Sequence, residues 1–211
     1  VTDYRSAEKI YFWQAAIRVL EATIRWAHNY AGKAREMAES ETDAGRRTEL
    51  LVIADRCERV PAHPPRDFRD AMQAFWFIYL AGHIEGSHLG YSPGRFDRYM
   101  YPYYQRDIFA GKITNEETLE LLEALRVKMT EIEYVASFSW EGLGSGNLYQ
   151  NMILGGTDEN GRRGDNELSM LILQSAIHCQ TTQPHLSIWY DSTLSDAFLL
   201  KAVECVKTGC G

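Results

Sequence analysis

The first forty residues carry an apolar stripe that is too long for a small domain. Apolar or small side chains recur at alternating intervals of three and four residues, which keeps them on one face of a helix. The members of this stripe are Ile10, Trp13, Ile17, Leu20, Ile24, Ala27, Ala31, Ala34 and Ala38. With Ser6 as its N-cap, such a helix would be about 45 Å long at ~1.5 Å per residue. We therefore expect it to lie along a large body of protein, with a close neighbour at the alanine half.

More helices are predicted before residue 134. Apolar side chains follow helical spacing over 49–59, 67–83 and 96–109, and a proline-rich segment at 61–65 separates the first two. Thr114 and Glu117 match a capping box, in which each side chain accepts a hydrogen bond from the backbone of the other residue. A further helix should therefore begin there and extend to Met129.

The pattern changes after residue 135. Residues 148–154 and 185–190 are typical of buried strands, a helix is predicted over 166–180, and Ser195 caps a last helix extending to Val206. This order is typical of a parallel sheet or barrel. Two strands are too few for a stable parallel sheet, so we expect the chain to be a fragment. The predicted organisation is a mainly helical part, 1–134, followed by the start of an α/β body, 135–211.

Composition excludes several classes of function. The net charge is −7 and no stretch concentrates lysine and arginine without acids, so nucleic-acid binding is not expected. No apolar run approaches the ~20 residues that a membrane span needs. The four cysteines lack Cys-x-x-Cys spacing and the chain shows no export signal, so we expect reduced thiols and a cytoplasmic protein.

Five stretches, taken together, resemble a known family. They are Val60-Pro61-Ala62-His63 with 68–77, Ser92-Pro93-Gly94-Arg95-Phe96-Asp97, 151–156 with 166–169, Gln183-Pro184-His185-Leu186-Ser187, and Gly209-Cys210-Gly211. In this order and spacing they are similar to the pyruvate formate-lyase domain of glycyl radical enzymes, from about Ala7 onward. Within that family, residues 126–147 are most similar to the arylacetate decarboxylases that act on 4-hydroxyphenylacetate and indoleacetate.

The resemblance implies a ten-stranded α/β barrel made of two five-stranded halves, into which the helical part of this chain leads. It also implies a protein glycyl radical, installed by a separate radical SAM activating enzyme, that oxidises a cysteine to a thiyl. The thiyl then starts radical chemistry on a small-molecule substrate held in a dry interior. We expect a homo-oligomer with no cofactor bound in this chain, and cleavage of a C–C bond in an arylacetate.

Other reactions stay open at this point. Dehydratases, C–N or C–S lyases and formate acetyltransferase-like enzymes of the same family share its general motifs. A non-catalytic helical scaffold or interaction module with common ancestry is a further alternative. The sequence beyond residue 211 would separate enzyme from scaffold, because the radical cysteine and glycine are expected there.

The resemblance assigns a substrate contact to the segment before the first strand. Ser137 aligns with a serine that contacts the substrate carboxylate in the hydroxyphenylacetate branch, and Phe138 and Trp140 would line an aromatic pocket. The alternatives are a loop serine bonded to local backbone and aromatic side chains that pack in a core. Cys210 lies in a Gly-x-Gly element instead of the Gly-Cys-x-Glu of radical cysteines, so we interpret it as a small buried residue at a helix C-cap. Cys205 is interpreted as a packing thiol.

Two superficial motifs do not predict ligands. The segment 83–88 contains two histidines and a glutamate, but their spacing differs from His-Glu-x-x-His, so no metal site is predicted. The glycines at 142, 144 and 146 precede a strand and lack the last glycine of a dinucleotide loop, so no nucleotide is predicted. Arg95 and Asp97 are expected to fix the turn that follows Pro93 and Gly94.

Overall fold

A computed structural model describes residues 4–86, 90–132 and 149–209 of the chain. These residues form two compact units, 1–81 and 82–211, which we describe separately. Among the described residues, no helix has both the length and the apolar character that crossing a membrane requires.

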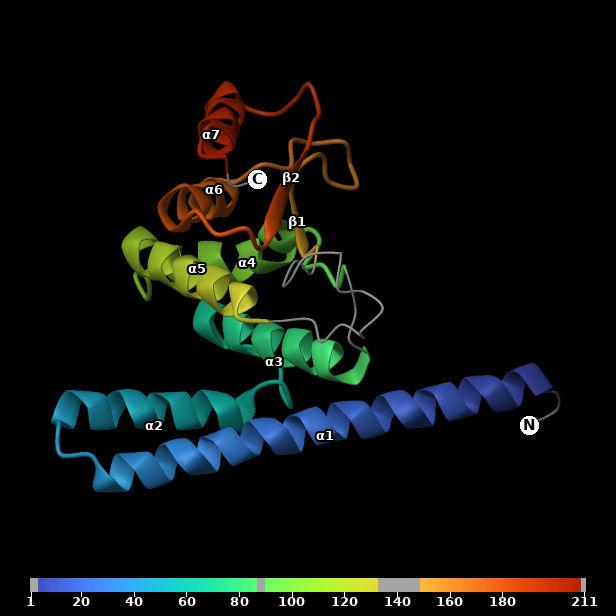
Figure 1. Cartoon of the computed structure of the whole chain (residues 1–211), viewed down its shortest axis with the longest axis vertical. Coiled ribbons are helices and arrows are strands. Elements are labelled where there is room, and N and C mark those ends of the chain that lie inside the picture. Colours follow the sequence, from blue (N-terminus) through green and yellow to red (C-terminus); the bar gives the residue numbers. More distant parts are fainter. Residues whose placement is uncertain (1–3, 87–89, 133–148, 210–211) are drawn as a thin grey trace, which may run out of the picture. The chain divides into compact units, whose positions relative to one another are not determined.

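The first unit is built on a helical hairpin. Helix α1, Tyr4–Ser40, turns back into α2, Ala44–Arg59, and the first part of α3, Phe68–Gly86, follows (Figure 1). A small core forms where the alanine half of α1 meets the other two helices, from Ala27, Ala31, Cys57 and Phe77, with Trp26 packed against it. The close approach that the alanine stripe predicted is therefore confirmed.

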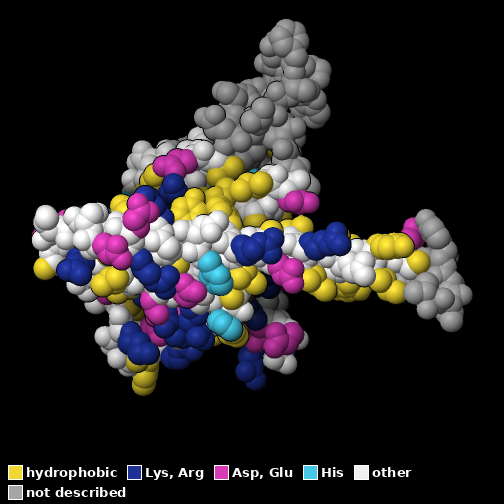
Figure 2. Space-filling model, turned by 90° about the horizontal axis from the view of Figure 1, so that it is seen from below, with side chains coloured by type: hydrophobic (Ala, Val, Ile, Leu, Met, Phe, Trp, Pro, Cys, Tyr) yellow, Lys and Arg dark blue, Asp and Glu magenta, His cyan; other side chains and the backbone are white. Residues whose placement is uncertain are grey.

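The N-terminal half of the stripe is exposed in this unit. Ile10, Trp13, Ile17 and Leu20 are 41%, 62%, 54% and 51% exposed, and Figure 2 shows apolar side chains along this part of α1. The physical reason is length: α2 has 16 residues against 37 in α1, so it pairs only with the C-terminal part of its neighbour. Within this unit the N-terminal half of the stripe is therefore uncovered, and the large body expected along the whole helix stays a prediction.

Two helix starts also lie upstream of their predicted positions. Helix α1 already includes Ser6, which the sequence had suggested as its N-cap. Helix α2 begins at Ala44 instead of residue 49, because the Asp43 carboxylate accepts a hydrogen bond of 2.7 Å from the backbone N–H of Arg46. This cap adds more than a turn to the predicted helix.

A buried carboxylate joins α2 to α3. Asp70 is completely buried, and its oxygens lie 3.2 Å from Arg56 Nη1 and 2.8 Å from Arg66 Nε, with Arg59 Nε at 3.9 Å. Burial alone would raise the pKa of Asp70, but the hydrogen bonds and charge of Arg66, helped by the charge of Arg56, lower it below its usual value. A cluster of three arginines around the buried Asp70 carboxylate therefore holds the connection between the two helices.

The second unit contains the predicted strand–helix–strand order. After α4, Phe96–Phe109, and α5, Asn115–Thr130, the chain forms β1, Asn151–Gly155, then α6, Glu167–Cys179, β2, His185–Trp189, and α7, Asp196–Val206. The two strands pair in parallel, with Asn151 opposite His185 and Gly155 opposite Trp189. The parallel β–α–β arrangement is confirmed, as a two-stranded sheet in the described residues.

The core of this unit lies between β1 and the helices. Its fully buried side chains include Phe96, Met129, Leu154, Leu168 and Phe198. The predicted capping box at Thr114 and Glu117 is present, and Ser195 caps α7 as expected. A second capping box begins α6, where Asn166 and Ser169 exchange hydrogen bonds.

Candidate functional site

The predicted substrate contacts fall in the connection between α5 and β1. Ser137, Phe138 and Trp140 lie outside the described residues, as do the glycines at 142, 144 and 146 and also Cys210. Their roles stay predictions. The structure does describe how the two ends of this connection are held.

Two buried glutamines hold the start of both strands against the end of α5. Gln183 Oε1 accepts a hydrogen bond of 3.0 Å from the backbone N–H of Gln150, whose own side chain donates to the carbonyl oxygen of Met129 at 3.2 Å. The backbone N–H of His185 donates to the Gln150 carbonyl at 2.8 Å. Gln150 and Gln183 are 0% and 2% exposed, so these bonds form away from competing water. We call this pair the glutamine clamp.

Helix α5 makes further polar contacts to the residues before β2. Arg126, which is 3% exposed, donates from Nη2 to the carbonyl oxygen of Thr181 at 3.1 Å. The Thr130 hydroxyl donates to the Arg126 carbonyl at 2.9 Å and lies 3.4 Å from the Gln183 carbonyl. The residue at which the connection leaves α5 and the residue at which it enters β1 are therefore both fixed by side chains.

Arg95 holds the opposite end of the strands. Its Nη2 donates to the Gly155 carbonyl at 2.6 Å and its Nη1 to the Thr157 carbonyl at 2.9 Å. Its guanidinium also lies over the Trp189 ring, 4.7 Å from the centroid, which is a cation–π geometry. The sequence predicted that Arg95 fixes the turn after Gly94. The structure adds contacts from Arg95 to the ends of both strands.

Asp97 ties α4, β1 and α6 together. It is completely buried, and its Oδ2 accepts hydrogen bonds from the Ser169 hydroxyl at 2.7 Å and the Gly155 N–H at 3.2 Å. Burial raises the pKa of Asp97, although the hydrogen bonds from Ser169 and Gly155 oppose this rise. Arg95 and Asp97, which we call the Arg–Asp clamp, therefore act on the same end of β1.

A glycine pair makes room at this end of the strand. Gly155 and Gly156 both have positive φ, +80° and +67°. A Cβ on Gly156 would lie 2.6 Å from Cδ2 of Trp189. Glycine is required here both for the backbone conformation and for the close approach of the indole.

The remaining sequence candidates do not assemble into a site. His83 lies in α3 and contacts the edge of the Tyr91 ring at 5.3 Å, and Glu85 is exposed. In the described part of the chain, no three side chains of metal-ligating type come together. Cys205 is buried in α7, as expected for a packing thiol.

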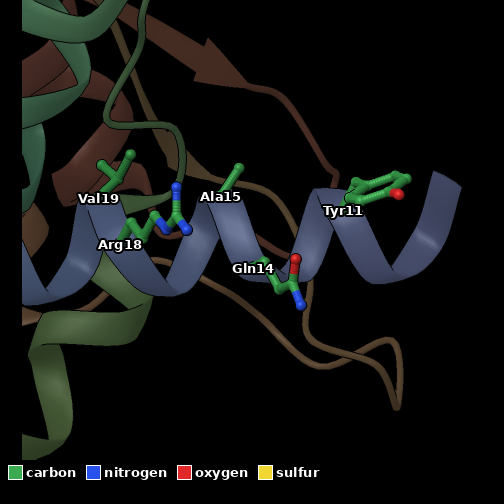
Figure 3. Close-up of a pocket in the computed structure, with 5 residues that line it drawn as sticks. All are labelled: Tyr11, Gln14, Ala15, Arg18 and Val19. Atoms are coloured by element: carbon green, nitrogen blue, oxygen red, sulfur yellow. The ribbon is translucent and has the colours of Figure 1, made fainter. Parts of the chain in front are cut away.

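A hollow on α1 is lined by one helix. Its residues are Tyr11, Gln14, Ala15, Arg18 and Val19 (Figure 3). Tyr11, Ala15 and Val19 are spaced by four residues and follow one line along the helix. A hollow with a single helical wall cannot enclose a ligand on several sides, so it is not a candidate active site.

The comparisons with known proteins agree with the motifs. The sequence model of the pyruvate formate lyase-like family matches residues 2–211. The chain is 44% identical to indoleacetate decarboxylase of Tractidigestivibacter scatoligenes over 100% of this chain and 24% of that protein. It is 40% identical to the 4-hydroxyphenylacetate decarboxylase glycyl radical subunit of Clostridioides difficile (strain 630), over 97% of this chain and 23% of that subunit.

A solved structure gives the same result for the fold. The structure described for 1,2-propanediol dehydration in Roseburia inulinivorans superposes with a TM-score of 0.93 at 40% identity, and covers 100% of this chain and 26% of that one. The chain thus spans about a quarter of the length of the curated relatives it matches.

The family's motifs and the described geometry coincide. The Ser-Pro-Gly-Arg-Phe-Asp stretch supplies the Arg–Asp clamp, and the Gln-Pro-His-Leu-Ser stretch supplies Gln183 of the glutamine clamp. With a match over residues 2–211 and these relatives, the chain belongs to the pyruvate formate lyase-like family and is similar to the glycyl radical decarboxylases of arylacetates.

Proposed function

We propose that this chain forms the helical part and the first strands of a glycyl radical enzyme's catalytic barrel. In this proposal the two strands begin a ten-stranded α/β barrel, and the radical cysteine and glycine lie beyond residue 211. One relative is itself described as a glycyl radical subunit, which supports this reading. The partners would be a radical SAM activating enzyme and further copies of the same protein, in the cytoplasm.

The proposed reaction is decarboxylation of an arylacetate. The observation that carries it is the identity of 44% and 40% to indoleacetate and 4-hydroxyphenylacetate decarboxylases across nearly the whole chain. The thiyl radical would start cleavage of the bond between the carboxylate and the methylene carbon. Ser137 would donate a hydrogen bond to the carboxylate, and Phe138 and Trp140 would contact the aromatic ring.

Dehydration of a diol is the second candidate. It is favoured by the 40% identity to the structure described for 1,2-propanediol dehydration, which is close to the values for the decarboxylases. A dehydratase would release water and retain every carbon of its substrate. The two candidates therefore differ in a product that is simple to measure.

The test is anaerobic activation of the intact enzyme that contains this chain. Electron paramagnetic resonance should detect a glycyl radical after incubation with the activating enzyme. The activated protein should then release carbon dioxide from 4-hydroxyphenylacetate or indoleacetate. Conversion of 1,2-propanediol without carbon dioxide release would establish the dehydratase instead, and absence of any radical would leave only the scaffold alternative.

A further inference from the structure

One face of the strand pair carries hydrogen-bonding side chains in place of a packed layer. On the other face, Met152 and Leu154 are 2% and 0% exposed and belong to the core of the second unit. The residues that alternate with them are Asn151 and Ile153 on β1 and His185, Ser187 and Trp189 on β2, which we call the polar sheet face. Its members are half-buried or exposed.

The composition of this face does not fit a second dry layer. Parallel strands that are covered by packed elements on both faces are almost continuously apolar. Here, four of the five side chains carry hydrogen-bonding groups: Asn151 and His185 at the start of the strands, Ser187 beside Ile153, and the indole N–H of Trp189 at the far end. A face with a few hydrogen-bonding groups placed among apolar ones matches a site that orients a small molecule.

Asn151 is oriented for binding by its neighbour. The Ser187 hydroxyl donates to Asn151 Oδ1 at 2.9 Å, which directs the amide nitrogen away from that bond. Within the part of the chain that the structure describes, the Nδ2 group has no hydrogen-bond partner. It therefore presents two N–H donors held by a side chain on the adjacent strand.

The arginine near this face already bonds to backbone carbonyl groups. Arg95 Nη1 and Nη2 bond to the carbonyl oxygens of Thr157 and Gly155, and its Nε is buried. A carboxylate approaching the face can meet the Asn151 amide and the ring N–H groups of His185 and Trp189, and of these the Asn151 amide is the group held in place by Ser187. An aryl group joined to that carboxylate by one methylene would lie toward Ile153, because two residues along a strand span about 7 Å.

We propose that the polar sheet face contacts the substrate, with the Asn151 amide binding its carboxylate, Ser187 positioning that amide, and Ile153 contacting its ring. This inference rests on the proposed function for the nature of the substrate. The inference adds Asn151, Ser187 and Ile153 to the substrate contact that the resemblance assigns to Ser137, between α5 and β1.

Two substitutions test it in the intact enzyme. Asn151→Asp keeps an oxygen that accepts from Ser187, so the strand pair is preserved, but it replaces the N–H donors with a negative charge. We expect the dissociation constant of 4-hydroxyphenylacetate or indoleacetate to rise at least about tenfold, because a charge-assisted hydrogen bond is lost and like charges repel. Ser187→Ala should raise it about threefold or more, since the amide is no longer held.

The matched control is Ser192→Ala, which removes the same hydroxyl from an exposed turn just beyond β2. Titration calorimetry with enzyme that has not been activated measures binding without the radical. Circular dichroism should give the same melting temperature for all variants. Dissociation constants of both variants within about twofold of the wild type would overturn the inference.

The same measurements separate this inference from the proposed function. If the wild type binds 1,2-propanediol and no arylacetate, the proposed decarboxylation is refuted. In that case Asn151→Asp and Ser187→Ala must weaken binding of the diol, or the inference about the polar sheet face is refuted as well. If activated wild type releases carbon dioxide while both variants keep their affinity, the function stands and the inference falls. A wild type that binds neither compound contradicts both.

Discussion

Replacement of the buried carboxylate in the first unit is expected to have a large effect that depends on pH. Asp70→Asn keeps the shape of the side chain and removes its charge from the cluster with Arg56, Arg59 and Arg66. Breaking a buried ion pair by removing one partner costs about 3–5 kcal/mol. The cost here should be smaller, because Arg56 keeps Asp67 at 3.0 Å, Arg66 keeps Asp55 at 2.6 Å, and the Arg66 side chain is 43% exposed. We therefore expect the free energy of unfolding to fall by about 2–3 kcal/mol at neutral pH.

The pH dependence gives this prediction a second signature. The pKa of Asp70 is lower in the folded protein than in the unfolded chain, so its contribution is complete above the unfolded value of about 4. That contribution is lost as the pH falls through the folded pKa, when both states bind the proton. The difference between wild type and Asp70→Asn should therefore shrink below about pH 4.

Urea titrations followed by circular dichroism measure the difference at neutral pH and near pH 3. Hydrogen exchange of peptides from α2 and α3, read by mass spectrometry, places any loss in this unit. Asp55→Asn is the control, because its carboxylate bonds to the same Arg66 but is 65% exposed, and exposed pairs contribute at most about 1 kcal/mol. Equal effects of the two substitutions, or a difference that persists in acid, would refute the reasoning.

Three further predictions concern the second unit. Gly156→Ala should lower the free energy of unfolding by about 2 kcal/mol or more, because the new Cβ meets Trp189. Gly161→Ala, also at positive φ but in open space, should lower it by about 1 kcal/mol. Urea titration compares the two variants, and equal losses would rule out the Trp189 contact as a cause. Thr114→Ala removes the N-cap of α5 and should lower the free energy of unfolding by about 1 kcal/mol. Hydrogen exchange in the first turn of α5 should become faster, and unchanged exchange would contradict the prediction. The pKa of Asp97 is raised, so its neutral form favours folding and that contribution is lost as the pH rises above about 4. Over that range the wild type should lose stability relative to Asp97→Asn, which is the reverse of the Asp70 result. Parallel pH profiles of stability for the two proteins would contradict the raised pKa of Asp97.

The elements that the sequence predicted well are those whose signals are local. The capping box at Thr114 and Glu117 and the cap at Ser195 each lie within one helical turn, so a short stretch of sequence contains the whole interaction. The parallel strand pair followed from the order of elements. The cap at Asp43 carried the same kind of signal, and a search for Asp before a helical pattern would have found it.

The parts that were missed depend on partners distant in sequence. Asp97 and Ser169 are 72 residues apart, and Gln150 and Gln183 are 33 apart, so no local pattern contains either contact. The exposed half of α1 has the spacing of a buried face, but α2 is too short to cover it, so the sequence alone could not say which part of the stripe would be buried in this unit. The Asn151 amide was not singled out because only the pairing register brings Ser187 beside it.

The position of the recognised motifs explains why the family is clear and the reaction is not. Arg95, Asp97 and Gln183 belong to those motifs, and each of them bonds to the ends of the strands, so similarity at these residues reports a shared scaffold. The chain is similar both to decarboxylases and to a structure described for dehydration, so this scaffold is common to both kinds of relative. The residues proposed to meet the substrate, Asn151 and Ile153, belong to one of the same motifs, 151–156, and lie between the two clamps on the polar sheet face. Neither side chain forms a bond of the two clamps, so binding measurements on that face test directly the specificity that the overall identity suggests.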